Sequence, residues 1–171
     1  MTSHPHDVLP LADGGKLIFT PCPGTKGVGL AESLAQLRHA GAHAVISMTP
    51  SDELKKLDVS ALPAAVAGAG MRWFHFPVED DEAPGPVFEQ AWAANRDAVL
   101  ALLSRHGGIA IHCRGGSGRT GLMAALILRE IGMDGTRADT LVKGLRPKAL
   151  TLPAHTDYLA ARDGRHSQQE Q

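Results

Sequence analysis

The most constraining feature of this chain is an apolar run, a glycine-rich turn and a second apolar run in direct succession. Residues 108–113 are typical of a buried β-strand that ends in Cys113, and residues 120–129 are typical of a helix. The turn between them reads Arg114-Gly115-Gly116-Ser117-Gly118-Arg119. A turn that opens a helix points several backbone N–H groups at one place, where the helix dipole adds positive potential. The segment therefore predicts an anion-binding loop with a thiol at its floor.

The residue types of this loop suit the binding of a tetrahedral dianion. Gly115, Gly116 and Gly118 let the backbone approach an anion closely, because no Cβ intervenes. Arg119 adds a planar guanidinium that can bind two phosphate oxygens at once. The same positive field, with His112 as a further candidate cation, is expected to hold Cys113 as a nucleophilic thiolate. The alternative is a buried structural cysteine, but that does not explain why the glycines and the arginine occur together.

Strand-like and helix-like segments alternate along the chain, which predicts an α/β fold. Strands are expected at 16–20, 44–48, 71–76 and 108–113. Helices are expected near 30–40, 59–67, 88–106, 120–129, 136–145 and 153–161, with a further short helix that begins after Ser51. The predicted architecture is a central, largely parallel sheet flanked by helices. Ligands of such sheets bind beyond the carboxyl ends of the strands, which is where Cys113 lies.

Length and composition indicate one domain. A chain of 171 residues with 43% apolar residues can bury a single core. We expect an N-terminal segment at 1–15, a domain at 16–161 and a polar, disordered tail at 162–171. The formal net charge of -1 provides no basic field for nucleic acid or an anionic membrane.

The chain also carries features of a cytoplasmic protein. Its first residues lack a secretory pattern, and no apolar run approaches the ~20 residues of a membrane span. Only Cys22 and Cys113 are present, which suits a reducing compartment. We therefore expect a cytoplasmic location, with neither nucleic-acid nor membrane partners.

An acidic run follows the third expected strand. It comprises Glu79, Asp80, Asp81 and Glu82, and lies between Pro77 and Pro84. Expelling an alkoxide or phenoxide from a phosphate ester is slow without a general acid. Because the run also follows a strand end, it should reach the same edge of the sheet as Cys113. A solvated acidic loop is the plainer alternative.

The nucleophile loop resembles the signature of cysteine-based protein phosphatases, His-Cys-x-x-Gly-x-x-Arg-Ser/Thr. It is matched by His112, Cys113, Gly116, Arg119 and Thr120. The resemblance implies that Cys113 attacks phosphorus to give a phosphocysteine, and that Thr120 donates a hydrogen bond to the sulfur when it departs. It implies no cofactor and no metal ion. Phosphate oxygens would be held by Arg119 and by the backbone amides of Arg114, Gly115, Gly116, Ser117 and Gly118.

The resemblance extends beyond this loop. The family pattern Pro-Ile/Val-x-Asp-x-x-x-Pro, matched from Pro77 to Pro84, assigns the acid to Asp80. The order of elements over residues 17–159 resembles the cyclin-dependent-kinase-associated phosphatases, small dual-specificity enzymes with a protein-tyrosine-phosphatase-like fold. One departure is His155, which stands where the family often has a glutamine that orients the hydrolytic water.

The predicted activity is hydrolysis of phosphotyrosine and/or phosphoserine/threonine monoesters in proteins or peptides. A small-molecule or phosphoinositide phosphatase is the alternative, although Arg114 is the only basic residue between Cys113 and Arg119. A sulfurtransferase would need no acid, and a catalytically silent phosphoprotein-binding module usually lacks the thiol, the arginine or the acid. A kinase partner is compatible with the resemblance, but no residue supports one. Cys22 is a candidate for a protective disulfide with Cys113, although an ordinary turn cysteine is the simpler interpretation.

Overall fold

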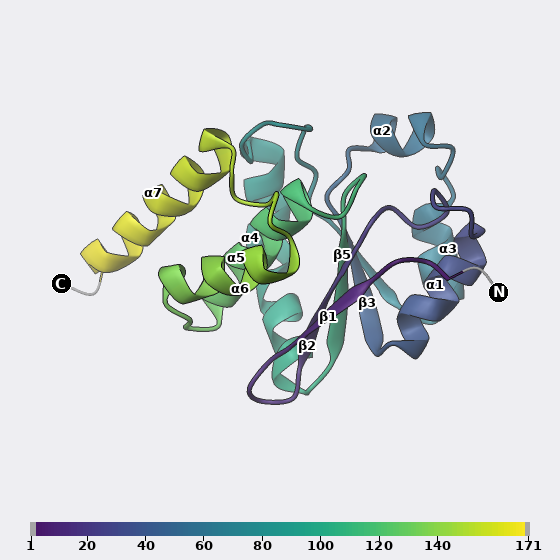
Figure 1. Cartoon of the computed structure of the whole chain (residues 1–171), viewed down its shortest axis with the longest axis horizontal. Coiled ribbons are helices and arrows are strands. Elements are labelled where there is room, and N and C mark those ends of the chain that lie inside the picture. Colours follow the sequence, from purple (N-terminus) through teal and green to yellow (C-terminus); the bar gives the residue numbers. More distant parts are fainter. Residues whose placement is uncertain (1–2, 170–171) are drawn as a thin grey trace.

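The computed structural model describes residues 3–169 and contains a five-stranded sheet between two layers of helices (Figure 1). The strands are β1 (Asp7–Pro10), β2 (Lys16–Thr20), β3 (Ala42–Ser47), β4 (Arg72–His75) and β5 (Gly108–His112). Their spatial order is β1-β2-β5-β3-β4. Strands β2, β5, β3 and β4 run parallel, and β1 is antiparallel to β2. The predicted α/β fold with a largely parallel sheet is confirmed.

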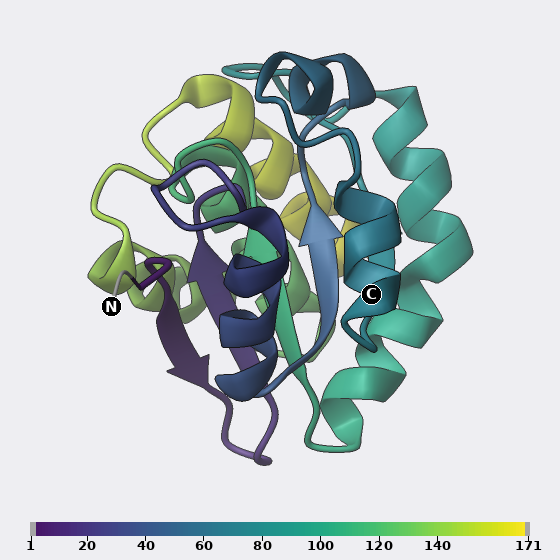
Figure 2. The same cartoon turned by 90° about the vertical axis from the view of Figure 1, so that its right-hand side faces the viewer.

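Helices cover both faces of this sheet (Figures 1 and 2). One face packs against α1 (Leu30–His39) and α3 (Leu62–Gly68), and the other against α4 (Pro86–Ser104) and α5 (Gly118–Glu130). Helices α6 (Gly135–Leu145) and α7 (Pro153–Gln169) contact α5, and the short α2 (Ser51–Lys56) follows β3. Within residues 3–169, none of the helices combines the length and the apolar character needed to cross a membrane.

Alternate residues of the four parallel strands enter two apolar clusters, one on each face of the sheet. In β2, Ile18 joins the cluster beneath α1 and α3, whereas Leu17 and Phe19 join the cluster beneath α4 and α5. The central strand β5 is buried along its whole length, as expected for a strand with neighbours on both sides and helices on both faces. This burial holds the next residue, Cys113, at the middle of the carboxyl-end edge.

The structure departs from the sequence expectation at both ends of the chain. Residues 7–10, within the expected N-terminal segment, form β1 and pair with β2. Helix α7 continues past Ala161 to Gln169, so it is longer than the expected 153–161, while 170 and 171 lie outside the described residues. Arg162 gives a physical reason, because it donates hydrogen bonds to Glu130 at 2.9 Å and to Tyr158 at 3.0 Å. Composition alone does not reveal such tertiary partners.

The carboxyl ends of the parallel strands meet at one edge of the sheet, at the top in Figure 2. Four connections leave this edge, namely residues 21–29 after β2, the segment with α2 after β3, residues 76–85 after β4 and residues 113–117 after β5. The last two are the predicted acid and nucleophile loops. The fold therefore brings these two loops to the same edge, although they are far apart in the sequence.

Candidate active site

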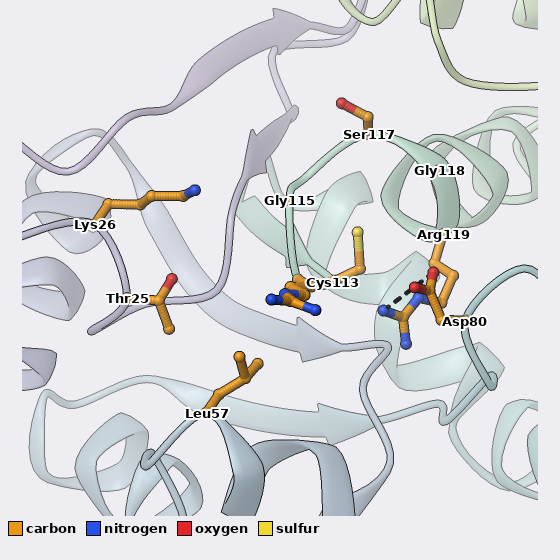
Figure 3. A pocket seen from close by; sticks show the side chains of 10 residues that line it. Thr25, Lys26, Leu57, Asp80, Cys113, Gly115, Ser117, Gly118 and Arg119 are labelled. Carbon is orange, nitrogen blue, oxygen red and sulfur yellow. Dashed lines mark ion pairs between the residues drawn. The ribbon is translucent and has the colours of Figure 1, made fainter.

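A pocket of about 380 Å³ opens at this edge, with Cys113 in its wall (Figure 3). Cys113 is only 4% exposed. Its Sγ accepts a hydrogen bond from the Gly116 N–H at 3.3 Å and another from the Thr120 hydroxyl at 3.2 Å. Both donors suit a sulfur that carries negative charge. The pocket is lined by Thr25, Lys26, Leu57, Asp80, Cys113, Arg114, Gly115, Ser117, Gly118 and Arg119.

The nucleophile loop depends on a glycine at Gly116, where φ is +82°. A Cβ there would lie 2.6 Å from the carbonyl carbon of Thr20, so a larger residue cannot fit without moving the backbone. The Gly116 carbonyl accepts a hydrogen bond from Arg146 Nε at 2.8 Å, and the Arg114 carbonyl accepts one from the Cys22 N–H at 3.0 Å. Two carbonyl groups of the loop thus accept hydrogen bonds from other parts of the protein, so they do not face an anion in the pocket.

Helix α5 begins directly after this loop, at Gly118, and is 13 residues long. The N–H groups of a first helical turn have no acceptor within the helix. The side chain of the preceding residue, Ser117, forms no capping hydrogen bond with them. These donors, with the helix dipole behind them, remain available to an anion in the pocket.

Arg119 is held in place by a carboxylate that sequence reasoning missed. Its Nη1 donates to Glu53 Oε1 at 2.9 Å and to the Val78 carbonyl at 2.9 Å, and its Nη2 donates to Glu53 Oε2 at 2.8 Å. A guanidinium has five N–H groups, so Nε and one hydrogen of Nη2 remain for a substrate. This edge has the spacing that a two-oxygen contact with phosphate requires. Glu53 therefore orients the arginine without occupying all of its donors.

Asp80 lies in the loop after β4, beside the guanidinium of Arg119. Its Oδ1 is 3.6 Å from Arg119 Nη2, and its side chain is 64% exposed (Figure 3). Of the four carboxylates at 79–82, all of which the structure describes, Asp80 is the one that lines the pocket. Glu79, Asp81 and Glu82 are exposed.

His112 was a candidate cation beside Cys113, but its surroundings keep the ring neutral. Ser47 Oγ accepts from Trp73 Nε1 at 2.9 Å and is 2.6 Å from His112 Nε2, so the serine hydroxyl donates to this ring nitrogen. The other nitrogen, Nδ1, donates to the Cys113 carbonyl at 3.0 Å. Complete burial lowers the pKa of His112 to about 4. The ring is therefore neutral at physiological pH and serves to position the strand end.

Cys22 lies beside the nucleophile loop, but its surroundings differ from those of Cys113. Its side chain is fully buried, and Sγ contacts the Pro23 carbonyl at 3.7 Å. Burial, reinforced by the nearby carboxylate of Glu53, raises the pKa of Cys22 to about 12. Cys22 thus stays a protonated thiol across the physiological range.

The sequence profile of a phosphatase family matches residues 24–133, well over half of the chain. That family is described as "Polymorphic toxin system, DSP-PTPase phosphatase". The chain belongs to this family. It is a cysteine-based phosphatase of the dual-specificity type, an enzyme class that acts on phosphorylated substrates. The predicted family and activity are confirmed.

Solved structures of other phosphatases share this dual-specificity fold. Kinase associated phosphatase, with its catalytic cysteine replaced by serine, has a TM-score of 0.80 at 21% identity, covering 93% of each chain. The active form of Tk-PTP has a TM-score of 0.68 at 23% identity, covering 90% of this chain and 95% of its own. PTPMT1 has a TM-score of 0.64 at 13% identity, covering 95% and 99%. Among curated proteins, no match is found.

Proposed function

We propose that this phosphatase hydrolyses phosphotyrosine and phosphoserine/threonine monoesters in proteins or peptides through a phosphocysteine intermediate. One observation carries the proposal. Cys113 Sγ receives hydrogen bonds from Gly116 and Thr120 inside a pocket that also contains Arg119 and Asp80. A nucleophile, an anion-binding loop and an acid thus share one small space, as group transfer from a phosphate ester requires.

In the first step, the Cys113 thiolate forms a bond to phosphorus while the bond to the leaving oxygen breaks. Asp80 gives its proton to that oxygen. The equatorial phosphate oxygens lie against the free edge of Arg119 and the amides of the nucleophile loop. These amides are contributed by Arg114, Gly115, Gly116, Ser117 and Gly118.

In the second step, a water molecule attacks the phosphocysteine and the bond from phosphorus to sulfur breaks. Asp80, now a carboxylate, accepts a proton from the water. The sulfur leaves as a thiolate, and the Thr120 hydroxyl that already donates to Sγ at 3.2 Å stabilises it. Phosphate then dissociates, and Asp80 keeps the proton needed for the next cycle.

The direct test is hydrolysis of p-nitrophenyl phosphate by the purified protein in the presence of a metal chelator. We expect turnover without added metal and competitive inhibition by vanadate, which occupies the anion-binding loop. The sulfurtransferase alternative predicts transfer of sulfur from thiosulfate to cyanide instead. Sulfur transfer with no phosphate release would contradict the proposal.

Two cations favour substrates with additional negative charge near the reacting phosphate. Lys26 and Arg114 line the pocket, and Lys26 lies across it from Asp80 (Figure 3). Within residues 3–169, neither side chain forms an ion pair or a hydrogen bond, so both charges are available to a ligand. We therefore propose that phosphopeptides with acidic residues beside the phosphorylated residue are preferred.

This preference predicts a specific effect of reversing one charge. Lys26→Glu should raise KM for a phosphopeptide with acidic flanking residues by about 2- to 5-fold, the range that an exposed charge pair supports. KM for p-nitrophenyl phosphate, which has no flanking charge, should rise less, and kcat for both substrates should stay unchanged. Steady-state kinetics on peptides that differ only in flanking charge measures the effect. Lys143→Glu, on the exposed side of α6, is the matched control. An equal change in KM for both substrates would contradict the assignment.

The cytoplasmic location also remains part of the proposal. Both cysteines are free in the structure, which suits a reducing compartment that preserves a nucleophilic thiol. The structure adds nothing in favour of a kinase partner.

A further inference from the structure

We propose that His155 is a positioning residue that holds the acid loop over the pocket. His155 lies near the start of α7, and its Nε2 donates a hydrogen bond to the Glu82 carbonyl at 3.0 Å. The residue is 1% exposed and does not line the pocket. The one hydrogen bond of its side chain therefore goes to the loop that carries Asp80, and His155 acts on the reaction through that loop.

The protonation of the ring fixes the direction of this hydrogen bond. The Glu82 carbonyl can only accept, so the proton of the neutral ring resides on Nε2. Nδ1 is then unprotonated, and it is buried with no hydrogen-bond partner in the described structure. Burial lowers the pKa of His155, and this outweighs the Glu82 carbonyl bond, which alone would raise it. Both observations describe a neutral imidazole whose single donor is given to the acid loop.

This bond completes a second point of attachment for the loop. Before Asp80, the Val78 N–H donates to the Met48 carbonyl at 2.9 Å and the Val78 carbonyl accepts from Arg119 at 2.9 Å. After Asp80, the Glu82 N–H closes a turn on the Glu79 carbonyl at 3.1 Å. That turn is fastened to the rest of the protein by His155. Asp80 is thus suspended between two fixed points, which keeps its carboxyl group close to Arg119 before any substrate binds.

A different role would follow from the family resemblance, in which a glutamine at this position orients the hydrolytic water. His155 does not fit that role, because its donor is already used and its side chain lies outside the pocket lining. The two roles predict different kinetics. Water orientation affects only the second step, whereas placement of Asp80 affects proton delivery to the leaving oxygen in the first. The inference rests on the proposed function, in which Asp80 is the acid.

The kinetic test uses variants that differ in their ability to donate. His155→Leu and the shorter His155→Asn cannot bond the Glu82 carbonyl, whereas His155→Gln retains a donor of suitable length. We expect the first two to lower kcat on an alkyl phosphate by about 3- to 10-fold, the loss expected for one hydrogen bond. KM and the rate with p-nitrophenyl phosphate should change little, and His155→Gln should recover most of kcat. Equal losses on all substrates, with a burst of p-nitrophenol, would instead identify a water-orienting residue and overturn the proposal.

Two further measurements separate this inference from the assignment of the acid. In an Asp80→Asn background, removal of the His155 donor should not lower kcat any further, because both changes act through the same proton transfer. Hydrogen exchange of the 79–83 amides should speed up in His155→Leu and His155→Asn but not in His39→Leu, an exposed control on α1. Exchange does not depend on which carboxylate is the acid. Unchanged exchange in the acid loop would overturn the positioning role, whereas an Asp80→Asn variant with full activity would overturn the acid assignment alone.

Discussion

Replacing Cys113 by serine is expected to abolish turnover while leaving the binding of phosphate analogues nearly intact. The loop amides and the edge of Arg119 remain in place, because Arg146 and Cys22 hold the loop carbonyls and Glu53 holds the arginine. A serine hydroxyl, however, needs a general base to become a nucleophile. His112 cannot serve, because its Nε2 is bound to Ser47 and its Nδ1 to the Cys113 carbonyl, 3.0 Å away. We therefore expect kcat to fall by at least about 10⁴-fold.

Steady-state hydrolysis of p-nitrophenyl phosphate measures the loss, and calorimetric titration with vanadate or tungstate measures the retained binding. Cys22→Ser is the matched control, since it changes the other cysteine of the chain and keeps a donor for the Pro23 carbonyl. It should retain most of the activity. Substantial turnover by Cys113→Ser would exclude a phosphocysteine intermediate.

The nucleophile loop was predictable from the sequence because its parts are consecutive. Strand, glycine turn and helix occupy residues 108–130, and the chemistry depends on local backbone geometry that glycine spacing reveals. The approach of the acid loop was also predictable, because parallel strands deliver their carboxyl ends to one edge. The four parallel strands lie within two residues of their expected positions, since their apolar runs are short and bounded by turns.

The residues that support the site were not predictable in the same way. Glu53 lies on a short charged helix, and nothing local shows that it binds Arg119, 66 positions away in the chain. Arg146 reaches the Gly116 carbonyl, and His155 reaches the Glu82 carbonyl, only after α6 and α7 have packed against α5. The neutral state of His112 depends on Ser47 and Trp73, which belong to neighbouring strands. Such contacts join distant segments through single side chains, and no periodic pattern encodes them.

Replacing Asp80 by asparagine is expected to lower kcat by about 10²–10⁴ on an alkyl or unactivated aryl phosphate, the usual range for general acid catalysis. The amide keeps the shape of the side chain but has no acidic proton to give. A good leaving group such as p-nitrophenolate departs with less help, so its rate should fall less. The pH profile is a second readout. Its basic limb reports deprotonation of the acid, and this limb should flatten in Asp80→Asn.

The neighbouring carboxylates provide controls that test the assignment to a single residue. Asp81 has φ of +64°, a conformation that asparagine also adopts readily, so Asp81→Asn removes the charge without straining the loop. Glu79→Gln likewise changes an exposed side chain that does not line the pocket. Both variants should keep most of the activity and both limbs of the pH profile. A large loss in Asp81→Asn that depends on the leaving group would move the acid by one residue. It would also mean that the loop rotates on substrate binding, because Asp80 is the carboxylate of this run that faces Arg119, at 3.6 Å, in the present arrangement.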